Sequence, residues 1–465
     1  MHKFLPLLVY ISYFIFCLGL LHIILLLIQT IIAFFCFKQN TNHSDVIEYF
    51  MDENPEFLIS ISVIVPAFNE EVTLTNNIHN LLALNYPSFD IIVVNDGSRD
   101  HTIDMLINTF NLLPTPYFFE QVIPHQPIKT IYRSQTHSNL WVVDKQNGGK
   151  ADAINAGITV SRADLFCVID ADSILDKDAL KRILRPFIEH PDDAVAAGGV
   201  ISGINNLDMQ SGRVTDSSLS SSILHNIQTL EYYRSFLIAR TFWDFIDGNF
   251  IISGAFGVFK KSAVIKVGGY SINTVGEDLE IIFKLHKLTK HTQKKTLFFI
   301  PDPVCWTETP DTLAGLSTQR KRWQRGMLET LIKHRNLLFD PKDFLFSWIV
   351  LPYLWLTEMI FVPATLLGYI LVIGLYINGS ISPEFFLAFF TLEFLLGLLV
   401  SLVAIVIKQW QEQILIGVLD ILIFFFSAII EVFGFRQLNS AWRVMGYWQF
   451  LKKKEGWGTI SRRGM

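Results

Sequence analysis

The chain has 465 residues, of which 51% are hydrophobic and 17% are charged, with a formal net charge of −5 at pH 7. Soluble domains typically carry about 25% charged residues. The deficit here, together with 39 phenylalanines, indicates membrane segments. The pI of about 6.2 argues against nucleic acid as a partner, because nucleic-acid-binding domains are usually basic. The four cysteines are scattered, so neither a disulfide framework nor a cysteine metal site is expected.

The first apolar run covers residues 4–37. One membrane span needs about 20 apolar residues and two need about 40. We therefore expect one long, tilted helix over residues 1–37, with a helix plus an interfacial turn near Pro6 as the alternative. The run exceeds the roughly 7–15 apolar residues of a signal peptide, and no A-x-A-like site follows, so cleavage is not expected. The polar and acidic residues 38–58 are predicted to be a linker.

From residue 59 onward the pattern alternates between strands and helices. Strands are predicted at 59–66, 90–96, 140–143 and 165–170, and helices from Asn69 and over 151–160. This alternation is typical of βαβ units around a parallel sheet. The segment 109–135, with its four prolines, is expected to be an irregular insert, and 205–223 a surface excursion. The predicted fold is an α/β, doubly wound domain over residues 59–312.

Three further apolar runs, at 344–376, 385–407 and 414–435, predict a transmembrane region over 344–435. The first contains two prolines and Glu358, and is interpreted as a span plus a re-entrant or interfacial piece, or as two short spans. Because a lipid-facing carboxylate is costly, Glu358 should face protein or a wet channel. The basic residues 436–465 are predicted to be a cytoplasmic tail. The number of crossings in 344–376, and with it the orientation of the termini, stays open.

An apolar run, 165–169, ends in Asp170 and Asp172. Ligands of open α/β sheets bind just past the carboxyl ends of strands. Two carboxylates there can hold a hard cation, and Mg²⁺ typically uses one or two carboxylates plus substrate phosphates. The alternative is a solvated turn, since Asp is common in turns.

Four other motifs accompany this pair in a fixed order. They are Pro66–Glu71, Asn95–Ser98, Asn147–Asn155 and Gly276–Asp278, and the segment Gln319–Trp323 follows them just before the apolar runs. Together they resemble the family 2 processive glycosyltransferases, the membrane-embedded synthases of cellulose, chitin, hyaluronan and poly-N-acetylglucosamine. The resemblance spans about residues 59–330. The Gly-Gly-Lys-Ala-Asp-Ala loop and the Gln-x-x-Arg-Trp motif look most like those of the poly-β-1,6-N-acetyl-D-glucosamine synthases.

The resemblance implies a nucleotide-sugar transferase domain of the GT-A-like type that binds a UDP-sugar. Asp96 would accept a hydrogen bond from uracil, with Asn95 in place of the family's usual first aspartate. The remaining donor residues and their implied contacts are Pro66, Asn69 and Glu70 along the nucleotide, Lys150 at the diphosphate, Asp152 at the uridine or sugar, and Asp170 at the ribose. Asp172, with Asp170, would bind Mg²⁺ or Mn²⁺.

The same resemblance implies the catalytic groups. Asp278, beside Glu277, matches the general base that takes the proton from the acceptor hydroxyl, although Gly276 replaces the family's Thr or Ser. The segment Ser253–Gly257 resembles the one that leaves space for the acceptor sugar, or it is a glycine-rich turn. Gln319, Arg322 and Trp323 match the Q-x-x-R-W motif, in which Trp stacks on the acceptor and Arg meets the diphosphate. Their helices, over 313–343, also suit an anionic membrane surface.

The implied activity is inverting, processive transfer from a UDP-sugar, with UDP-N-acetylglucosamine preferred, into a β-linked polysaccharide that is exported. The implied partners are the UDP-sugar, the growing polysaccharide and the lipid bilayer of a cell membrane, with the catalytic domain cytoplasmic in a multi-pass chain. The sequence leaves an accessory membrane subunit open. The alternatives are a non-processive transferase acting on a lipid-linked acceptor, a cellulose- or hyaluronan-type synthase using another UDP-hexose, and a channel with a degenerate nucleotide-binding domain.

Overall fold

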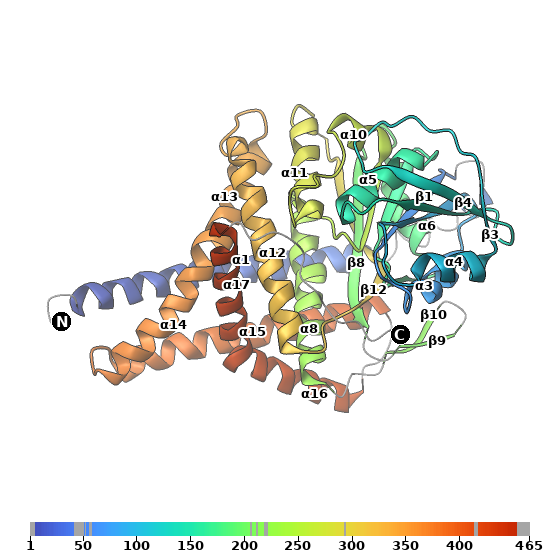
Figure 1. The fold of residues 1–465 in the computed structure, drawn as a ribbon. Helices are drawn as coiled ribbons and strands as arrows, with labels where there is room; N and C mark the ends of the chain where they lie inside the picture. Colours follow the sequence, from blue (N-terminus) through green and yellow to red (C-terminus); the bar gives the residue numbers. More distant parts are fainter. Residues whose placement is uncertain are drawn as a thin grey trace. The chain divides into compact units, whose positions relative to one another are not determined.

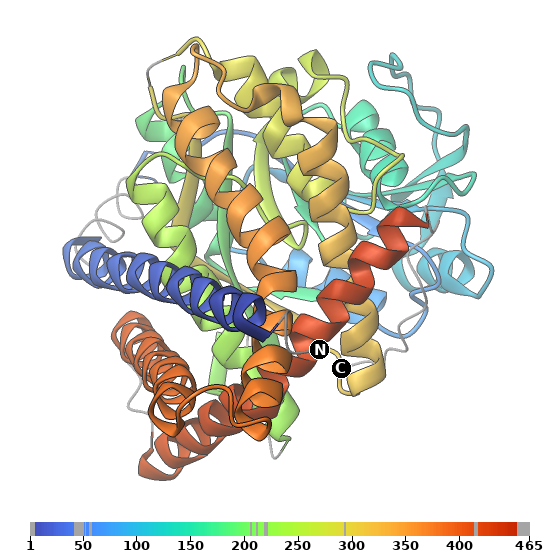
Figure 2. The same cartoon turned by 90° about the vertical axis from the view of Figure 1, so that its left-hand side faces the viewer.

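The computed structural model of the chain describes residues 5–40, 51, 53–54, 58–204, 207–210, 213–217, 222–292, 294–412 and 417–452. They divide into two units. The sheet unit has its described residues between 40 and 218 and between 246 and 309, and the helical unit has the rest. Figures 1 and 2 draw both units from two directions.

The sheet unit is organised around four central parallel strands. Among the described residues they belong to a ten-stranded mixed sheet of order β3-β4-β5-β2-β1-β6-β11-β8-β12-β7. The parallel strands are β5 (Leu140–Lys145), β2 (Phe89–Asn95), β1 (Ile61–Ala67) and β6 (Leu165–Ile169). Because these strands are parallel, their carboxyl ends lie along the same edge of the sheet, which we call the carboxyl edge.

The outer strands are mostly antiparallel, although β8 and β12 pair in parallel. They are β3 (Leu112–Pro114), β4 (Ile128–Ser134), β7 (Ser173–Leu175), β8 (Ala196–Ile204), β11 (Phe256–Lys260) and β12 (Leu297–Glu308). The predicted α/β fold is therefore confirmed, with a mixed sheet around the predicted parallel centre.

Alternate strand residues form the main core of the sheet unit. Ile64, Ile92 and Phe166 belong to one buried cluster with side chains of α5 (Lys150–Val160), α10 (Lys261–Lys266) and α11 (Glu277–Thr289). This period of two follows from the pleat of a strand. The other helices that contact the sheet are α3 (Leu74–Leu82) at β7, α4 (Thr102–Phe110) at β3 and α6 (Ala179–Ile183) at β12, and α6 leads into α7 (Arg185–Glu189).

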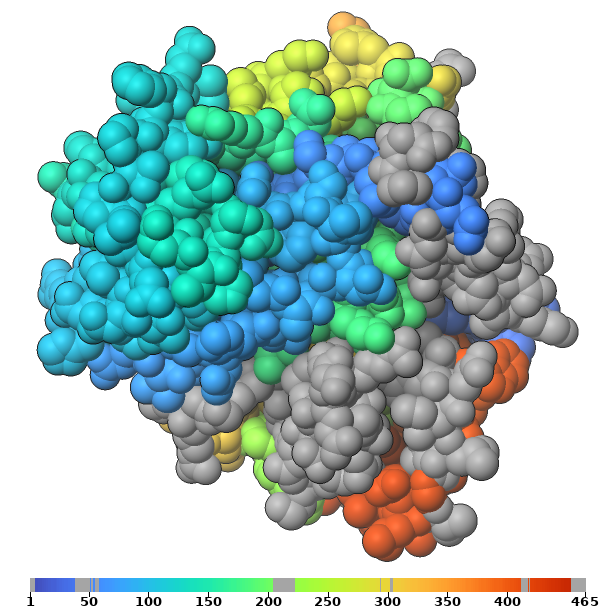
Figure 3. All heavy atoms as spheres, turned by 90° about the vertical axis from the view of Figure 1, so that its right-hand side faces the viewer, coloured from blue at the N-terminus to red at the C-terminus, as the bar shows by residue number. Residues whose placement is uncertain are grey.

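The prediction of an irregular insert at 109–135 is wrong in part. Its two ends form β3 and β4, which pair with each other and extend the sheet beyond β5. The prolines 116 and 124 lie between these strands, where no ladder hydrogen bond is needed. The N-terminal segments of the sheet unit, coloured blue and teal, make up much of the face drawn in Figure 3. Within the predicted surface excursion at 205–223, β9 (Leu207–Gln210) and β10 (Arg213–Ser217) pair antiparallel. For residues 205–206, 211–212 and 218–221, this prediction lies outside the described residues.

The helical unit contains three helices that are long and apolar enough to span a membrane, among the residues the structure describes. They are Leu5–Phe37, Leu345–Ile377 and Pro383–Trp410. The first lies within α1 (Leu5–Asn40), which is unbroken from its first turn onward. Pro6 lies in the first turn of this helix, where proline is tolerated. The prediction of a single long helix is confirmed, and the alternative of an interfacial turn near Pro6 is wrong.

The second candidate span is one unbroken helical run of 33 residues. It consists of η4 (Leu345–Val350), α13 (Leu351–Leu354), η5 (Trp355–Phe361) and α14 (Val362–Ile377). The π-helical segments η4 and η5 directly precede the two turns that hold the prolines, and such segments shift the backbone hydrogen bonds. The interpretation as two short spans is therefore wrong.

The remaining helices of this unit include α15 (Pro383–Glu412), which contains the third candidate span. The others are α8 (Ile223–Tyr233), η2 (Arg234–Arg240), α9 (Thr241–Phe245), α12 (Leu313–Lys333), η3 (Arg335–Leu337), α16 (Val418–Ile430), η6 (Glu431–Phe435) and α17 (Arg436–Leu451). The third predicted run, 414–435, is described from residue 417 and bends at Phe433 and Gly434, whose backbone angles are not helical. The total number of membrane crossings stays a prediction.

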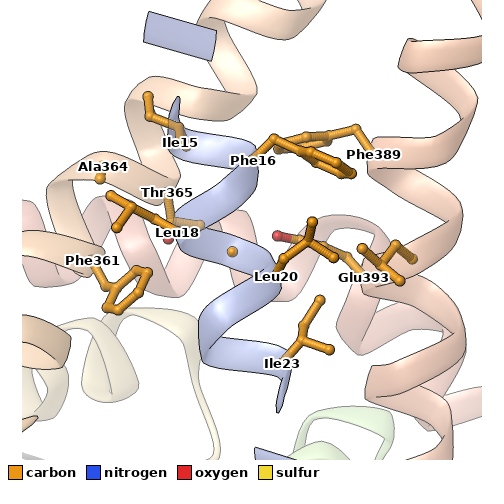
Figure 4. A pocket seen from close by; sticks show the side chains of 12 residues that line it. Ile15, Phe16, Leu18, Leu20, Ile23, Phe361, Ala364, Thr365, Phe389 and Glu393 are labelled. Carbon is orange, nitrogen blue, oxygen red and sulfur yellow. The ribbon is translucent and has the colours of Figure 1, made fainter. Parts of the chain in front are cut away.

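Three acidic side chains of the helical unit have hydrogen-bonded partners. Glu358 accepts a hydrogen bond from the Arg443 guanidinium, so the expectation that it faces protein is confirmed. Glu431, 1% exposed, binds Arg234 at 2.5 Å and Arg436 at 3.1 Å. An apolar groove between α1, α14 and α15 is shown in Figure 4. Its acidic lining residue, Glu393, is also hydrogen-bonded, by the Tyr369 hydroxyl.

Candidate active site

The loops that follow β1 and β2 are joined at the carboxyl edge. Pro66 is the last residue but one of β1. The next predicted site residue, Asn69, has a left-handed backbone (φ 58°), which asparagine tolerates. Its amide donates to Ser98 Oγ at 3.0 Å, and Arg99 N–H donates to Asn69 Oδ1 at 2.8 Å. The Glu70 amide donates to Thr102 Oγ1 at 3.0 Å. The predicted nucleotide-lining loop is thus fixed to the loop that begins at Asp96.

Asp96, directly after β2, is almost fully buried, at 2% exposed. Its Oδ1 accepts from Lys145 Nζ at 2.5 Å and from Gly148 N–H at 3.0 Å. Its Oδ2 accepts from Gly149 N–H at 2.7 Å and from Asn147 Nδ2 at 3.0 Å. Burial raises the pKa of Asp96, and the Lys145 ammonium and the glycine amides oppose that rise. The roughly four acceptor positions of the carboxylate are therefore all used by the segment 145–149.

Asp152, in the first turn of α5, is bound by the same lysine. It is 2% exposed. Its Oδ1 lies 2.5 Å from Lys145 Nζ, and Gln126 N–H donates to both of its oxygens at 3.1 and 3.0 Å. The two aspartates predicted to contact the nucleotide therefore share one buried cation. Lys145 was missed by the sequence analysis, because a charged residue at a strand end usually indicates a solvated turn.

Lys150, at the start of α5, faces the second group of predicted acids. Its ammonium forms an ion pair with Asp170 and lies 4.0 Å from Glu277 Oε1. Burial disfavours this ammonium, but the carboxylates of Asp170, Glu277 and Asp278 outweigh burial and raise the pKa of Lys150. The resemblance predicted that Lys150 contacts the diphosphate of the donor. In the structure, its ammonium lies among the carboxylates at the carboxyl edge.

Asp170 and Asp172 follow β6 as predicted. Asn77 Nδ2 fixes their turn by donating to the carbonyl oxygens of Asp170 (3.1 Å), Ala171 (3.1 Å) and Ser173 (2.5 Å). Within the described ranges, no group of three or more His, Cys, Asp or Glu side chains is arranged to hold a metal. Two hard carboxylate oxygen donors fit an ion that takes its other ligands from a substrate diphosphate.

Asp278, at the second residue of α11, lies against the predicted acceptor segment. Its Oδ2 accepts from Gly254 N–H at 3.3 Å, and its Oδ1 accepts from Leu279 N–H at 2.9 Å. A Cβ atom on Gly254 would lie 3.3 Å from Lys150 Nζ and 3.4 Å from Asp278 Cβ. Glycine therefore leaves the space in which these two side chains approach each other. Asp278 is half-buried, whereas Glu277 is 4% exposed.

A side-chain clamp joins α5 to the loop that precedes these acids. Asn155 Nδ2 donates to the Tyr270 carbonyl at 2.9 Å, and the Tyr270 amide donates to Asn155 Oδ1 at 2.8 Å. Both residues are buried. Asn155 belongs to a motif that the sequence analysis quoted, but that analysis gave it no role.

Gln319, Arg322 and Trp323 lie on α12 of the helical unit. The neighbouring Arg320 binds Glu231 Oε2 at 2.6 Å, and its guanidinium lies 4.5 Å from the centre of the Trp323 ring. Trp323 itself is 42% exposed. The approach of these residues to Asp278 stays a prediction.

The fold and the acidic carboxyl edge define the class of GT-A-like glycosyltransferases. A mannosyltransferase from Pyrobaculum calidifontis, solved in complex with GDP-Man and Mn2+, has a similar fold, with a TM-score of 0.53 at 14% identity over 92% of this chain and 100% of that one. The family model described as "Glycosyl transferase family group 2" matches residues 165–429, and the model described as "Glycosyl transferase family 2" matches residues 62–119. The chain belongs to the family 2 glycosyltransferases, which are sugar-transferring enzymes.

Two named relatives give a more specific similarity than the family alone. A poly-beta-1,6-N-acetyl-D-glucosamine synthase of Staphylococcus aureus is 31% identical over 283 residues, which are 61% of this chain and 58% of that protein. The synthase of the same name from Staphylococcus epidermidis is 26% identical over 407 residues, 85% of each chain. The match thus spans little more than half of the Staphylococcus aureus relative. Among the described residues, the three helices that are long and apolar enough to span a membrane indicate a membrane protein.

Proposed function

We propose that this chain is an inverting, processive hexosyltransferase that builds a β-linked polysaccharide from UDP-N-acetylglucosamine and exports it across the membrane. The names of the relatives support the polymer and its sugar unit, N-acetylglucosamine. The observation that carries the proposal is the meeting of Asp278 with Gly254 and Lys150 at the carboxyl edge. The residue proposed as the base, the segment proposed to contact the acceptor and a cation thus lie together in the sheet unit.

The donor would bind along the loops of the carboxyl edge. Pro66, Asn69 and Glu70 would line the nucleotide, and Asp96 and Asp152 would lie beside its uridine. Because the acceptor positions of Asp96 are filled, a direct bond to uracil requires that one loop bond be exchanged.

The diphosphate would lie near Lys150 and the turn of Asp170 and Asp172. These two aspartates would hold Mg²⁺ or Mn²⁺, which supplies positive charge for the departing UDP. The Lys150 ammonium adds positive charge at the same place, because it already contacts Asp170.

Asp278 would take the proton from the acceptor hydroxyl as that oxygen attacks the anomeric carbon. The new C–O bond forms on the face opposite the bond to UDP, so the configuration inverts and an α-linked donor gives a β-linkage. Glu277 would hold Lys150 in place from the same helical turn. Gln319, Arg322 and Trp323 would bind the acceptor end and the diphosphate, and stacking on Trp323 would retain the growing chain.

Nucleotide sugars are cytoplasmic, so the catalytic domain at 59–312 would face the cytoplasm of a multi-pass chain, and its basic tail would lie on the same side. The growing polysaccharide and the bilayer would be its partners.

The test compares Asp278→Asn with the parent in lipid nanodiscs, using a panel of radiolabelled UDP-sugars. We expect UDP affinity within about threefold of the parent and turnover lower by about 10²–10⁴-fold, the usual contribution of a general base. Asp104→Asn, at an exposed position on α4, is the matched control and should match the parent. Near-parental polymerisation by Asp278→Asn would refute the base. A product of one added sugar would instead favour transfer to a lipid-linked acceptor.

A further inference from the structure

The side chain of Lys145 at the end of β5 is fully buried, at 0% exposed. Its Nζ lies 2.5 Å from Asp96 Oδ1, 2.5 Å from Asp152 Oδ1 and 2.6 Å from the carbonyl oxygen of Gln146. An ammonium has three donors, so these partners use all of them. A buried charge is tolerated only when it is paired and hydrogen-bonded, and this one is paired with two carboxylates.

These contacts join three separate parts of the sheet unit. Asp96 follows β2, Lys145 ends β5, and Asp152 lies in the first turn of α5. The loop between β5 and α5 is the glycine-rich segment 146–149. Its Gly148 and Gly149 amides both donate to Asp96, so the position of that carboxylate determines the position of the loop.

We propose that Lys145 is a positioning residue of the donor site. It holds Asp96 and Asp152 against each other, and through Asp96 it fixes the glycine loop that leads to Lys150. Without the ammonium, two carboxylates that converge on one point would be left without their shared cation. They would move apart or take up a proton, and the loop amides would lose their fixed acceptor. The link to sugar donors rests on the proposed function, whereas the effect on the loop does not.

The experiment uses the full chain in nanodiscs and compares Lys145→Met with the parent. Methionine keeps most of the side-chain volume and removes the charge. The matched control is Lys129→Met on the neighbouring β4, where the lysine is 50% exposed and pairs with Asp144 at 3.4 Å. Two readouts are taken, namely hydrogen–deuterium exchange without any donor and the steady-state kinetics with UDP-N-acetylglucosamine.

For Lys145→Met we expect the amides of residues 148–149 to exchange at least about tenfold faster, with the central strands still protected. We expect KM for the donor to rise at least about tenfold while kcat changes less than about threefold, since Lys145 touches no reacting atom. Lys129→Met should match the parent in both readouts.

Unchanged exchange at 148–149 would overturn the proposal, and so would an equal loss of protection over the whole sheet, which indicates a purely structural role. If Lys145→Met does not fold, the same comparison is made with Lys145→Gln, which removes the charge and keeps two N–H donors. A parent that uses no UDP-sugar would refute the proposed function, while the exchange measurement would still decide the role of Lys145.

Discussion

The clamp between Asn155 and Tyr270 gives a quantitative prediction. Asn155→Ala removes two hydrogen bonds of 2.9 and 2.8 Å and leaves the backbone N–H and C=O of Tyr270 without these partners. Asn155 is 2% and Tyr270 5% exposed, so water cannot easily replace the lost bonds. Each buried polar group that loses its partner costs about 1–3 kcal/mol. We therefore expect a loss of about 4 kcal/mol in the free energy of unfolding.

The assay is thermal unfolding of the purified chain, followed by intrinsic fluorescence. For a domain of about 150–250 residues, 1 kcal/mol corresponds to about 2–4 °C in Tm, so Asn155→Ala should unfold roughly 8–16 °C below the parent. The matched control is Asn139→Ala, because Asn139 donates only one long bond of 3.5 Å, to the Phe89 carbonyl. Its Tm should stay within about 3 °C of the parent, because Asn139 is only half-buried and the lost bond is long.

The clamp should also affect turnover, because the loop after Tyr270 leads directly to Glu277 and Asp278. We expect kcat of Asn155→Ala, measured well below its Tm, to fall more than the affinity for UDP. If Asn155→Ala unfolds at the same temperature as Asn139→Ala and keeps full turnover, the clamp neither stabilises the sheet unit nor positions the base.

Three further predictions concern other positions. Gly148→Ala places a Cβ atom against the Asp152 carboxylate. It should therefore destabilise the protein by about 1–3 kcal/mol and raise KM for the donor. A KM equal to that of the parent would contradict the close packing of Gly148 against Asp152. Burial lowers the pKa of His286 to about 4, below its value of about 6.5 in an unfolded chain. The neutral, buried imidazole therefore contributes fully to the free energy of unfolding above about pH 6.5, and up to about 3 kcal/mol of that free energy is lost as the pH falls through 4. His286→Gln should flatten this part of a Tm-against-pH curve. Arg443→Met leaves Glu358 without its ion pair and should cost about 3–5 kcal/mol, whereas Arg443→Lys should recover part of the lost Tm.

The sequence predicted the centre of the sheet well, because local patterns determine it. The strands expected at 59–66 and 165–170 are β1 and β6, shifted by no more than two residues. The antiparallel partner of β6 was not predicted. β11 pairs with β6 although about 90 residues separate them in the chain, and no local periodicity reports such a pairing. The strand β4 was missed because its burial alternates weakly.

The sequence predicted candidate site residues by their type, and it did not predict the contacts that support them. Acidic residues after β2 and β6 indicated a ligand-binding edge, and the structure brings the loops of that edge together. The role of Lys145 could not be predicted, because a lysine between Asp144 and Gln146 has the local sequence of a solvated turn. Only the approach of Asp96 and Asp152 from other elements shows that this lysine is buried and shared.

Asp96 and Asp278, the acid proposed as the base, differ in the number of hydrogen bonds that their carboxylates accept. Asp96 accepts four, from Lys145 and the loop that follows it. In the part of the chain that the structure describes, Asp278 accepts two, both from backbone amides. A carboxylate has about four acceptor positions, so Asp278 can still receive a hydroxyl, whereas Asp96 must first release a loop bond. Asp96→Asn should therefore raise KM and loosen the loop, whereas Asp278→Asn should lower kcat. Reversed effects would assign positioning to Asp278 and the reaction to another acid.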